Sequence, residues 1–393
     1  MLHRERVIAA LEAKADRFSG YDLALRDTLA AYEKALQDAA ALSRAELDAR
    51  LASVPWPGAR PTDEHDRFPG LVVPFGQKWT NHEQARAWAR GVLEDAPVVA
   101  VDGSQITPTK DVSLPVGAVQ VGWFVNPHST GGVYVKDIAF EILAPDELSG
   151  DDADPSGFPD WRVNARRFAL ECEKIAEFIA EARDDPVKPV CIFDGSLIVS
   201  FAGQMKPERQ RLYVAAIEEL LRVSEECRVP LVGYVDTSYA SDLAAMLDVL
   251  SARSPATSVS DGALLRKRLE WGDRSTAFIC ARDDQVEPTG SWGKYYERVC
   301  FVYLKTTQDR APARLDVPRW LVEAGALEPL VDVIRAECVV GNGYPYAVET
   351  ADALAVITMQ DRERFYRVLQ EFAEKRELPL RWSRKMVSKR GRR

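Results

Sequence analysis

Two short apolar segments of this chain end in the same tripeptide, Asp-Gly-Ser, and this repetition constrains the fold more than any other feature. Residues 97–101 precede Asp102, and residues 190–193 precede Asp194. A short apolar run predicts a buried β-strand, and a glycine after the aspartate permits a sharp turn at the strand end. One such turn is common, because Asp-Gly is a frequent turn dipeptide. Two copies, each after a strand, favour a site that both carboxylates share.

The order of the expected elements indicates a mixed α/β fold. We expect strands at 97–101, 116–125, 133–143, 190–193 and 230–235, with helices at 161–183, 208–227 and 241–250. Three antiparallel strands followed by parallel additions are the ribonuclease H-like layout, a mixed sheet with flanking helices. In that layout the first and fourth strands are neighbours. Asp102 and Asp194 would therefore lie side by side at one edge of the sheet.

Helical segments are expected on both sides of this core. Residues 1–80 are interpreted as an N-terminal helical arm and a Pro/Gly-rich connector, suited to dimerisation or partner docking. The core domain is placed at residues 81–375, with an insertion at about 255–300, and it ends in a C-terminal helical extension. Residues 376–393 are interpreted as a basic tail that can contact phosphate groups, because 381–393 contain seven basic residues and no acidic one.

Composition argues against several kinds of site and location. Only four histidines are present, and none of the six cysteines forms a Cys-x-x-Cys pair, so a zinc centre or a disulfide framework is not expected. No apolar run approaches the roughly 18 residues that span a membrane, and the N-terminus is too charged for a secretory signal. We therefore expect no membrane segment and a cytoplasmic location. The net charge of −9 argues against a uniformly basic coat for nucleic acid.

The acidic residues indicate a metal site. Mg²⁺ and Mn²⁺ prefer hard oxygen ligands, and phosphodiester hydrolysis at sites of this type uses two divalent ions about 4 Å apart. Asp102 and Asp194 are the first two expected ligands. A third is expected from the helix between them, where Glu171 is the best candidate. Either Asp236, at the end of the strand 230–235, or Asp352, early in a late helix, would complete the cluster.

The choice of Glu171 depends on the apolar stripe of that helix. Phe168, Cys172 and Ile175 recur at helical spacing and define the buried face. Glu171 lies at the edge of this face, whereas Glu173, the alternative ligand, points further round toward solvent. A charge at the edge of a core needs a partner, and a metal ion would provide one.

Further polar side chains could contact a phosphodiester substrate. Ser104 and Ser196 can donate a hydrogen bond to a phosphate or orient a carboxylate. Arg167 lies on the same helix as Glu171 and is a candidate phosphate contact. Other basic residues expected near the cleft are Arg166, Lys206, Arg209 and Arg211.

Four segments together resemble the NurA-type nuclease family. They read VVAVDGSQ, RRFALECEKIAEF, CIFDGSLI and GYPYAVETADALAVIT, and the resemblance runs from about residue 97 to 359. It implies a ribonuclease H-like fold and Mn²⁺-dependent DNA cleavage in end resection and repair, as a 5′ to 3′ exonuclease with single-strand endonuclease activity. It also implies a homodimer that works with a HerA-type hexameric ATPase translocase.

By position, Asp102 and Asp194 match the metal-binding aspartates of that family, and Glu171 matches its helix glutamate. Tyr344 matches the late Tyr-Pro turn and is expected to contact DNA. The family has a histidine one or two turns later, and this chain has Asp352 instead. A carboxylate can ligate a metal ion, but it cannot repeat the chemistry of a neutral imidazole.

Two other functions fit parts of the pattern. A catalytically weakened nuclease fold could serve as a docking subunit of the translocase complex. An actin-like phosphotransferase shares the sheet order, but it requires an Asp-x-Gly-Thr/Ser turn, and here glycine follows aspartate directly. Cleavage of DNA in the presence of Mn²⁺ separates the nuclease from both alternatives.

Overall fold

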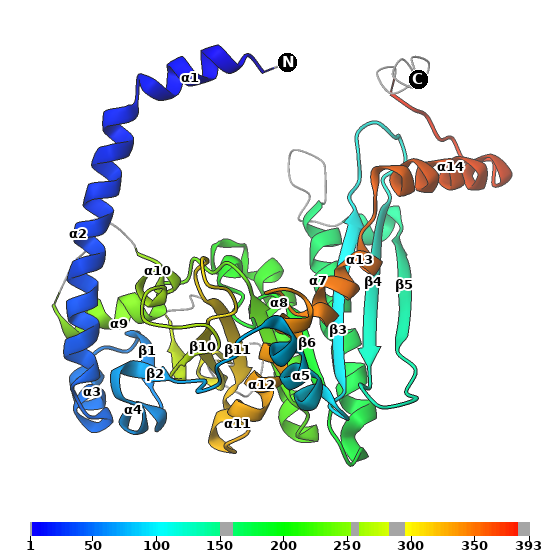
Figure 1. Cartoon of the computed structure of the whole chain (residues 1–393). Helices are drawn as coiled ribbons and strands as arrows, with labels where there is room; N and C mark the ends of the chain where they lie inside the picture. The colour runs from blue at the N-terminus through cyan, green and yellow to red at the C-terminus, as the bar shows by residue number, and fades with distance from the viewer. Residues whose placement is uncertain (1, 150–159, 253–258, 283–294, 384–393) are drawn as a thin grey trace. The chain divides into compact units, whose positions relative to one another are not determined.

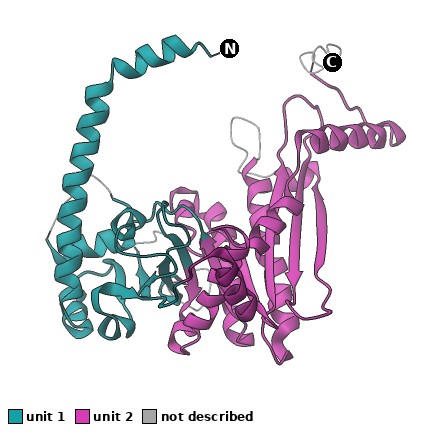
Figure 2. Ribbon diagram, viewed as in Figure 1, with its two compact units in different colours: residues 1–78, 235–283, 296–315 teal, residues 79–234, 284–295, 316–393 magenta. Residues whose placement is uncertain are grey.

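The computed structural model describes residues 2–149, 160–252, 259–282 and 295–383 of the chain (Figure 1). The chain forms two units, shown in separate colours in Figure 2. Unit 1 consists of residues 1–78, 235–283 and 296–315, and unit 2 consists of residues 79–234, 284–295 and 316–393. The basic residues 384–393 of the expected tail lie outside the described part.

Five strands at the centre of unit 2 have the order β7-β6-β3-β4-β5. Their bounds are β3 (Val98–Ile106), β4 (Gly117–Asn126), β5 (Val135–Leu143), β6 (Val190–Asp194) and β7 (Leu231–Val235). β3, β4 and β5 pair antiparallel, whereas β6 pairs parallel with both β3 and β7. This is the ribonuclease H-like order, and the expected fold class is confirmed.

One detail of the sequence interpretation is wrong. The first Asp-Gly-Ser is not a turn, because β3 continues through Asp102 to Ile106 and pairs with β4 along its whole length. The partner strand is ten residues long and supplies hydrogen-bonding groups opposite every residue of β3. The second copy does leave its strand: Gly195 has φ +147°, which strongly favours glycine.

Helices cover the sheet of unit 2 on both faces. They are α5 (His82–Leu93), α6 (Pro145–Leu148), α7 (Asp160–Glu181), α8 (Pro207–Cys227), α11 (Arg319–Glu323), α12 (Leu327–Val340), α13 (Tyr346–Ala355) and α14 (Met359–Lys375), with 3-10 turns η2 (Ala182–Asp184) and η3 (Ser200–Gln204). A Cβ at Gly103 would point at α7, whereas a Cβ at Gly122 would point at the end of α13. Gly122 pairs with Asp102, so these two positions share the face opposite that of Gly103. Helices α7 and α13 therefore cover opposite faces beside Asp102.

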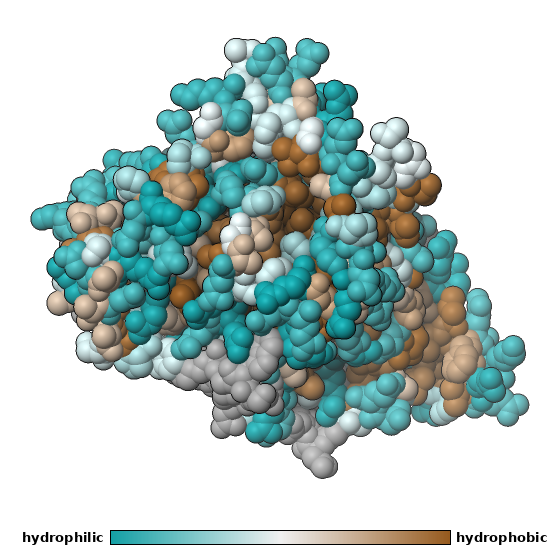
Figure 3. Space-filling view, turned by 90° about the horizontal axis from the view of Figure 1, so that it is seen from below, coloured by the Kyte–Doolittle hydropathy of each residue, from teal (hydrophilic) through white to brown (hydrophobic). Residues whose placement is uncertain are grey.

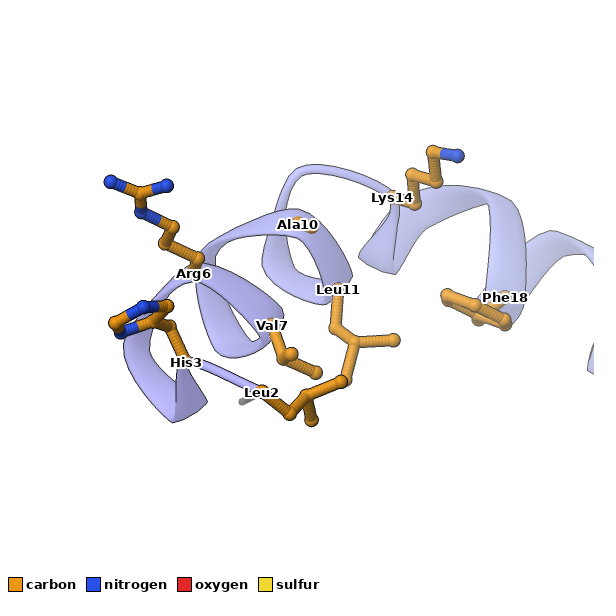
Figure 4. Close-up of a pocket in the computed structure, with 8 residues that line it drawn as sticks. All are labelled: Leu2, His3, Arg6, Val7, Ala10, Leu11, Lys14 and Phe18. Atoms are coloured by element: carbon orange, nitrogen blue, oxygen red, sulfur yellow. The ribbon is translucent and has the colours of Figure 1, made fainter. Parts of the chain in front are cut away.

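Unit 1 combines a helical arm with short strands in the order β1-β9-β10. Its elements are α1 (Arg4–Glu12), α2 (Ala15–Ala40), α3 (Arg44–Leu51), β1 (Gly58–Pro61), α4 (Glu64–Arg67), η1 (Pro69–Leu71), β2 (Val72–Val73), α9 (Asp242–Leu250), α10 (Asp261–Leu265), β8 (Arg274–Ser275), β9 (Phe278–Ala281) and β10 (Val299–Leu304). At the start of the arm, Leu2, Val7 and Leu11 border a surface pocket together with Phe18 of α2 (Figure 4).

Some elements differ from the sequence expectation. The connector and the insertion contain strands that pair, β1 with β9 and β2 with β8, because such short segments carry little periodic signal. Residues 319–340 do not form one continuous helix, because the chain breaks between α11 and α12, where Gly325 has φ +69°. Strand β11 (Ala313–Pro318), which carries the chain from unit 1 into unit 2, was not expected. η4 (Tyr295–Arg298) precedes β10.

The surface in Figure 3 is mostly hydrophilic, and hydrophobic residues form separate patches on it. Such patches are ordinary on protein surfaces. No helix within the described residues has the length and apolar character needed to cross a membrane.

Candidate active site

Asp102 and Asp194 lie on neighbouring parallel strands. β3 and β6 are in register through Val101 and Phe193, and each aspartate is the next residue of its strand. Neighbouring strands are about 4.8 Å apart, so the two backbones bring both carboxylates to one place at the end of the sheet. The side-by-side placement expected from the sequence is present.

Acidic side chains at this end of the sheet affect the pKa of Asp102. Burial, together with the negative charges of Asp194 and Asp352, raises the pKa of Asp102 to about 6. The backbone amide of Gly103 and the guanidinium of Arg167 act on this pKa in the opposite direction. The carboxylate of Asp102 on β3 is therefore close enough to those on β6 and α13 to be repelled by both, which favours binding of a cation.

Glu171 of α7 approaches the same place from the other face of the sheet. Its side chain is buried, with 3% of the residue exposed, and burial raises its pKa to about 7. Asp102 and Asp194 also raise this pKa, whereas Arg167 lowers it. The Arg167 guanidinium donates to the Glu171 carboxylate and, at 3.4 Å, to the carbonyl of Gly103.

Glu171 and Glu173 of α7 have different surroundings. Glu173 accepts a hydrogen bond of 2.8 Å from Arg166, which also pairs with Glu141. The Glu173 side chain is 51% exposed. Asp102 and Asp194 act electrostatically on Glu171, so Glu171 is the better candidate ligand of these two helix glutamates.

Two glycines allow this close packing. A Cβ at Gly103 would overlap the Glu171 carboxylate. A Cβ at Gly122 would lie 2.9 Å from the backbone nitrogen of Ala355, near the end of α13. Gly103 thus admits the side chain of Glu171, and Gly122 admits the helix that carries Asp352. Gly122 was missed in the sequence, because its role depends on the register with β4.

Tyr344 meets Asp194 directly. The Tyr344 hydroxyl donates to Oδ1 of Asp194 at 3.1 Å. The Tyr344 ring packs edge-on against Tyr234 at 5.2 Å between ring centroids. The turn before it is tight, since Asn342 and Gly343 have φ of +56° and +104°. This residue, expected from the late Gly-Tyr-Pro turn, therefore lies at the carboxylate cluster.

The two serines are engaged in internal hydrogen bonds. Ser104 accepts from the backbone N–H of Ile357 at 3.3 Å, just after α13. Ser196 donates to Oδ2 of Asp316 at 2.5 Å, and the backbone N–H of Leu197 donates to the same oxygen at 3.2 Å. Asp316 is fully buried and was missed in the sequence. The sequence feature that indicates a buried, hydrogen-bonded role for Asp316 is its place inside the mostly apolar stretch ARLDVP. The expected DNA contacts of both serines stay predictions.

Asp236 lies in unit 1, and its contacts are with Thr237 and Arg310. It accepts from the Thr237 hydroxyl at 3.2 Å and lies 3.9 Å from the Arg310 guanidinium. Its expected role as a ligand stays a prediction.

Within the described residues, no three His, Cys, Asp or Glu side chains are already arranged around an ion-sized space. The donor set at the sheet end is nevertheless of the type that fits a hard divalent cation, because it consists of carboxylates, of which Asp102 and Glu171 are repelled by other acidic groups. Arg167 supplies a positive charge beside Glu171.

The sheet order, with acidic residues at the ends of two neighbouring strands, is that of a ribonuclease H-like fold. The NurA domain model matches residues 96–357 of the sequence. The chain belongs to the NurA domain family, and the resemblance seen in the sequence is confirmed.

Several solved structures are similar to this chain. A crystal structure of NurA with manganese aligns at 11% identity and a TM-score of 0.41, covering 70% of this chain and 89% of the other. A second NurA crystal structure gives 11% and 0.42, with coverage of 70% and 88%. The catalytic domain of human endonuclease V gives 16% and 0.30, with coverage of 76% and 92%. A search of curated proteins found no match.

Proposed function

We propose that this protein is a divalent-metal-dependent nuclease that cleaves DNA. The observation that carries the proposal is the group of carboxylates at the end of the sheet, where Asp194 and Asp352 repel Asp102, and where Asp102 and Asp194 repel Glu171. Two of these groups have a raised pKa because they are buried near like charges. Proteins keep such an arrangement at a cost in stability, and a bound cation offsets that cost.

Asp102, Asp194 and Glu171 would hold Mn²⁺ or Mg²⁺, with Asp352 as the remaining ligand of a two-metal site. When bound, the ions supply positive charge beside the scissile phosphate and lower the pKa of an attacking water. Asp352 stands where the family resemblance places a histidine, so this chain offers carboxyl oxygens there in place of an imidazole nitrogen.

The residues around the ligands have positioning roles in this proposal. Tyr344 orients the Asp194 carboxylate through its hydrogen bond to Oδ1. Arg167 holds Glu171 in the metal-free protein and can move to a DNA phosphate when a cation takes over that carboxylate. Ser104 and Ser196 form hydrogen bonds with the chain after α13 and with Asp316, and we propose contact with DNA as their second role.

Family membership supports finer proposals about the biological setting. We propose that the protein acts in DNA end resection and repair in the cytoplasm, as a 5′ to 3′ exonuclease with single-strand endonuclease activity. We further propose a homodimer that works with a HerA-type hexameric ATPase. End-labelled DNA reports the polarity of cleavage, light scattering reports the oligomeric state, and co-purification with such an ATPase reports the complex.

Metal removal tests the proposed activity. Protein treated with EDTA is expected to cleave single-stranded DNA at least about 100-fold more slowly than protein with added Mn²⁺, because the carboxylates alone cannot stabilise a pentavalent phosphate. Gel analysis of a labelled oligonucleotide measures the rate. Equal cleavage in excess EDTA would contradict metal dependence. Absence of cleavage by folded protein at high concentration with Mn²⁺ would favour the docking-subunit alternative.

Gly103→Ala tests the approach of Glu171. The added methyl group overlaps the Glu171 carboxylate, so we expect at least a tenfold loss of Mn²⁺-dependent cleavage, corresponding to about 1.4 kcal/mol of transition-state stabilisation. Gly91→Ala in α5 is the matched control, because no atom lies within 4 Å of a Cβ there. The melting temperature of both variants shows whether they fold. A Gly103→Ala protein that cleaves at the wild-type rate would contradict the assignment of Glu171 to the site.

A further inference from the structure

Two arginines share one tryptophan at the beginning of α7 and α8. The guanidinium carbon of Arg162 lies 4.6 Å from the ring centroid of Trp161, and that of Arg209 lies 4.5 Å from the same ring. Both distances are in the range of favourable cation–π contacts. The indole therefore fixes two planar cations from different helices in one place and leaves their N–H edges available to a ligand.

Neither cation is neutralised within the described part of the chain. No ion pair joins Arg162 or Arg209 to a carboxylate there, and the Nε atom of Arg209 is buried without a hydrogen-bond acceptor among the described residues. By contrast, Arg222, further along α8, pairs with both Glu219 and Glu226. Two like charges held at one ring repel each other, so an anion with several acceptor oxygens would stabilise them.

This pair of arginines is linked to the carboxylate site. Arg209 and Arg167 both act on the hydroxyl of Tyr213, where their positive charges oppose the rise in its pKa that burial causes. Arg167 is in turn bonded to Glu171. Trp161 precedes Glu171 by ten residues of the same helix, which places it about 15 Å away along the axis.

A series of packed aromatic rings connects the carboxylate site with the region of Tyr213 and Arg209. Phe193, next to Asp194, packs on Phe168 at 5.7 Å, and Phe168 packs on Phe201 at 6.3 Å. Phe201 also packs against Tyr213 at 5.1 Å. Despite these contacts Phe201 is 50% exposed, so part of its ring is free to stack on an unpaired base.

We propose that Trp161, Arg162 and Arg209 form a phosphate clamp for a single DNA strand beside the carboxylate site, with Phe201 as the stacking surface for one base. The inference rests on the proposed DNA nuclease function and names a substrate-binding part of it. The clamp holds the backbone of the strand, and the stacked base requires that this part of the strand is unpaired. A local cationic site of this kind is compatible with a net charge of −9, because it needs only two charges in one place.

Binding without cleavage tests the clamp. The full-length protein is titrated in EDTA against a fluorescein-labelled oligothymidylate, and anisotropy gives Kd at several salt concentrations. Arg162→Gln and Arg209→Gln are each expected to weaken binding about tenfold and to reduce the slope of log K against log salt by about one. Phe201→Ala is expected to weaken single-strand binding about tenfold and to leave binding of a duplex of equal length unchanged.

Arg222→Gln is the matched control, because it removes an arginine of α8 that already has carboxylate partners. It should bind like the wild type, and the melting temperatures of all variants should agree within a few degrees. Unchanged Kd and salt slope for the Arg162 and Arg209 variants, equal weakening by the control, or no oligothymidylate binding by the wild type would overturn the clamp. Because no metal is present, these outcomes are independent of whether Mn²⁺ supports cleavage.

Discussion

Asp102→Asn and Asp194→Asn are each expected to lower Mn²⁺-dependent DNA cleavage by about a thousandfold or more, which corresponds to at least about 4 kcal/mol of transition-state stabilisation. Asparagine keeps the size of the side chain and removes its charge, so its neutral carbonyl oxygen binds a divalent cation more weakly than a carboxylate does. Initial rates on a labelled single-stranded oligonucleotide measure the effect.

The same substitutions should leave the metal-free fold intact. Asp102 is a buried carboxylate whose pKa is raised by burial and by Asp194, so loss of either charge relieves repulsion. Asp185→Asn is the matched control, since this exposed aspartate precedes the opposite end of β6. We expect it to retain the wild-type rate. Substantial cleavage by a well-folded Asp102→Asn or Asp194→Asn protein would contradict a shared metal site.

Glu171→Gln is expected to lower cleavage by about 100-fold or more and, at the same time, to stabilise the metal-free protein above pH 7. Burial raises the pKa of Glu171 from 4.5 to about 7, so the folded protein disfavours the charged form. The resulting penalty is absent below about pH 4.5, grows as pH rises toward 7 and is complete above it. Its upper limit is about 3 kcal/mol, from 1.36 kcal/mol per pKa unit.

Melting temperatures in EDTA between pH 5 and pH 8 measure this effect. The wild type should lose stability over that interval relative to Glu171→Gln, and added Mn²⁺ should stabilise the wild type more than the variant. Glu173→Gln is the control, because Glu173 is exposed and paired with Arg166. If Glu173→Gln lost the activity and Glu171→Gln kept it, the assignment of the helix ligand would be reversed.

Much of this site is predictable from local sequence. The apolar runs before Asp102 and Asp194 identify two strands, and the order of elements around them implies that these strands are neighbours. The stripe of α7 also selects Glu171 over Glu173, because burial on a helix follows its period. The structure agrees with each of these inferences about position.

Features that depend on register or on distant partners are not visible in the sequence. Gly122 matters only because β4 places it opposite Asp102, and Asp316 only because it accepts from Ser196. The strand character of Ser104 likewise depends on the length of β4. Arg209 is one of several basic residues expected near the cleft, but its contact with Trp161 depends on the fold, because its helix begins 46 residues after that tryptophan.

The central claim is that Asp102 and Asp194 hold the same divalent cation. Anomalous diffraction from crystals soaked in Mn²⁺, collected near the manganese absorption edge, tests it most directly. We expect anomalous density within about 2.5 Å of a carboxylate oxygen of both aspartates, with Glu171 or Asp352 as a further ligand. Manganese density that is confined to other sites, with Asp102 and Asp194 unliganded at saturating Mn²⁺, would contradict the account.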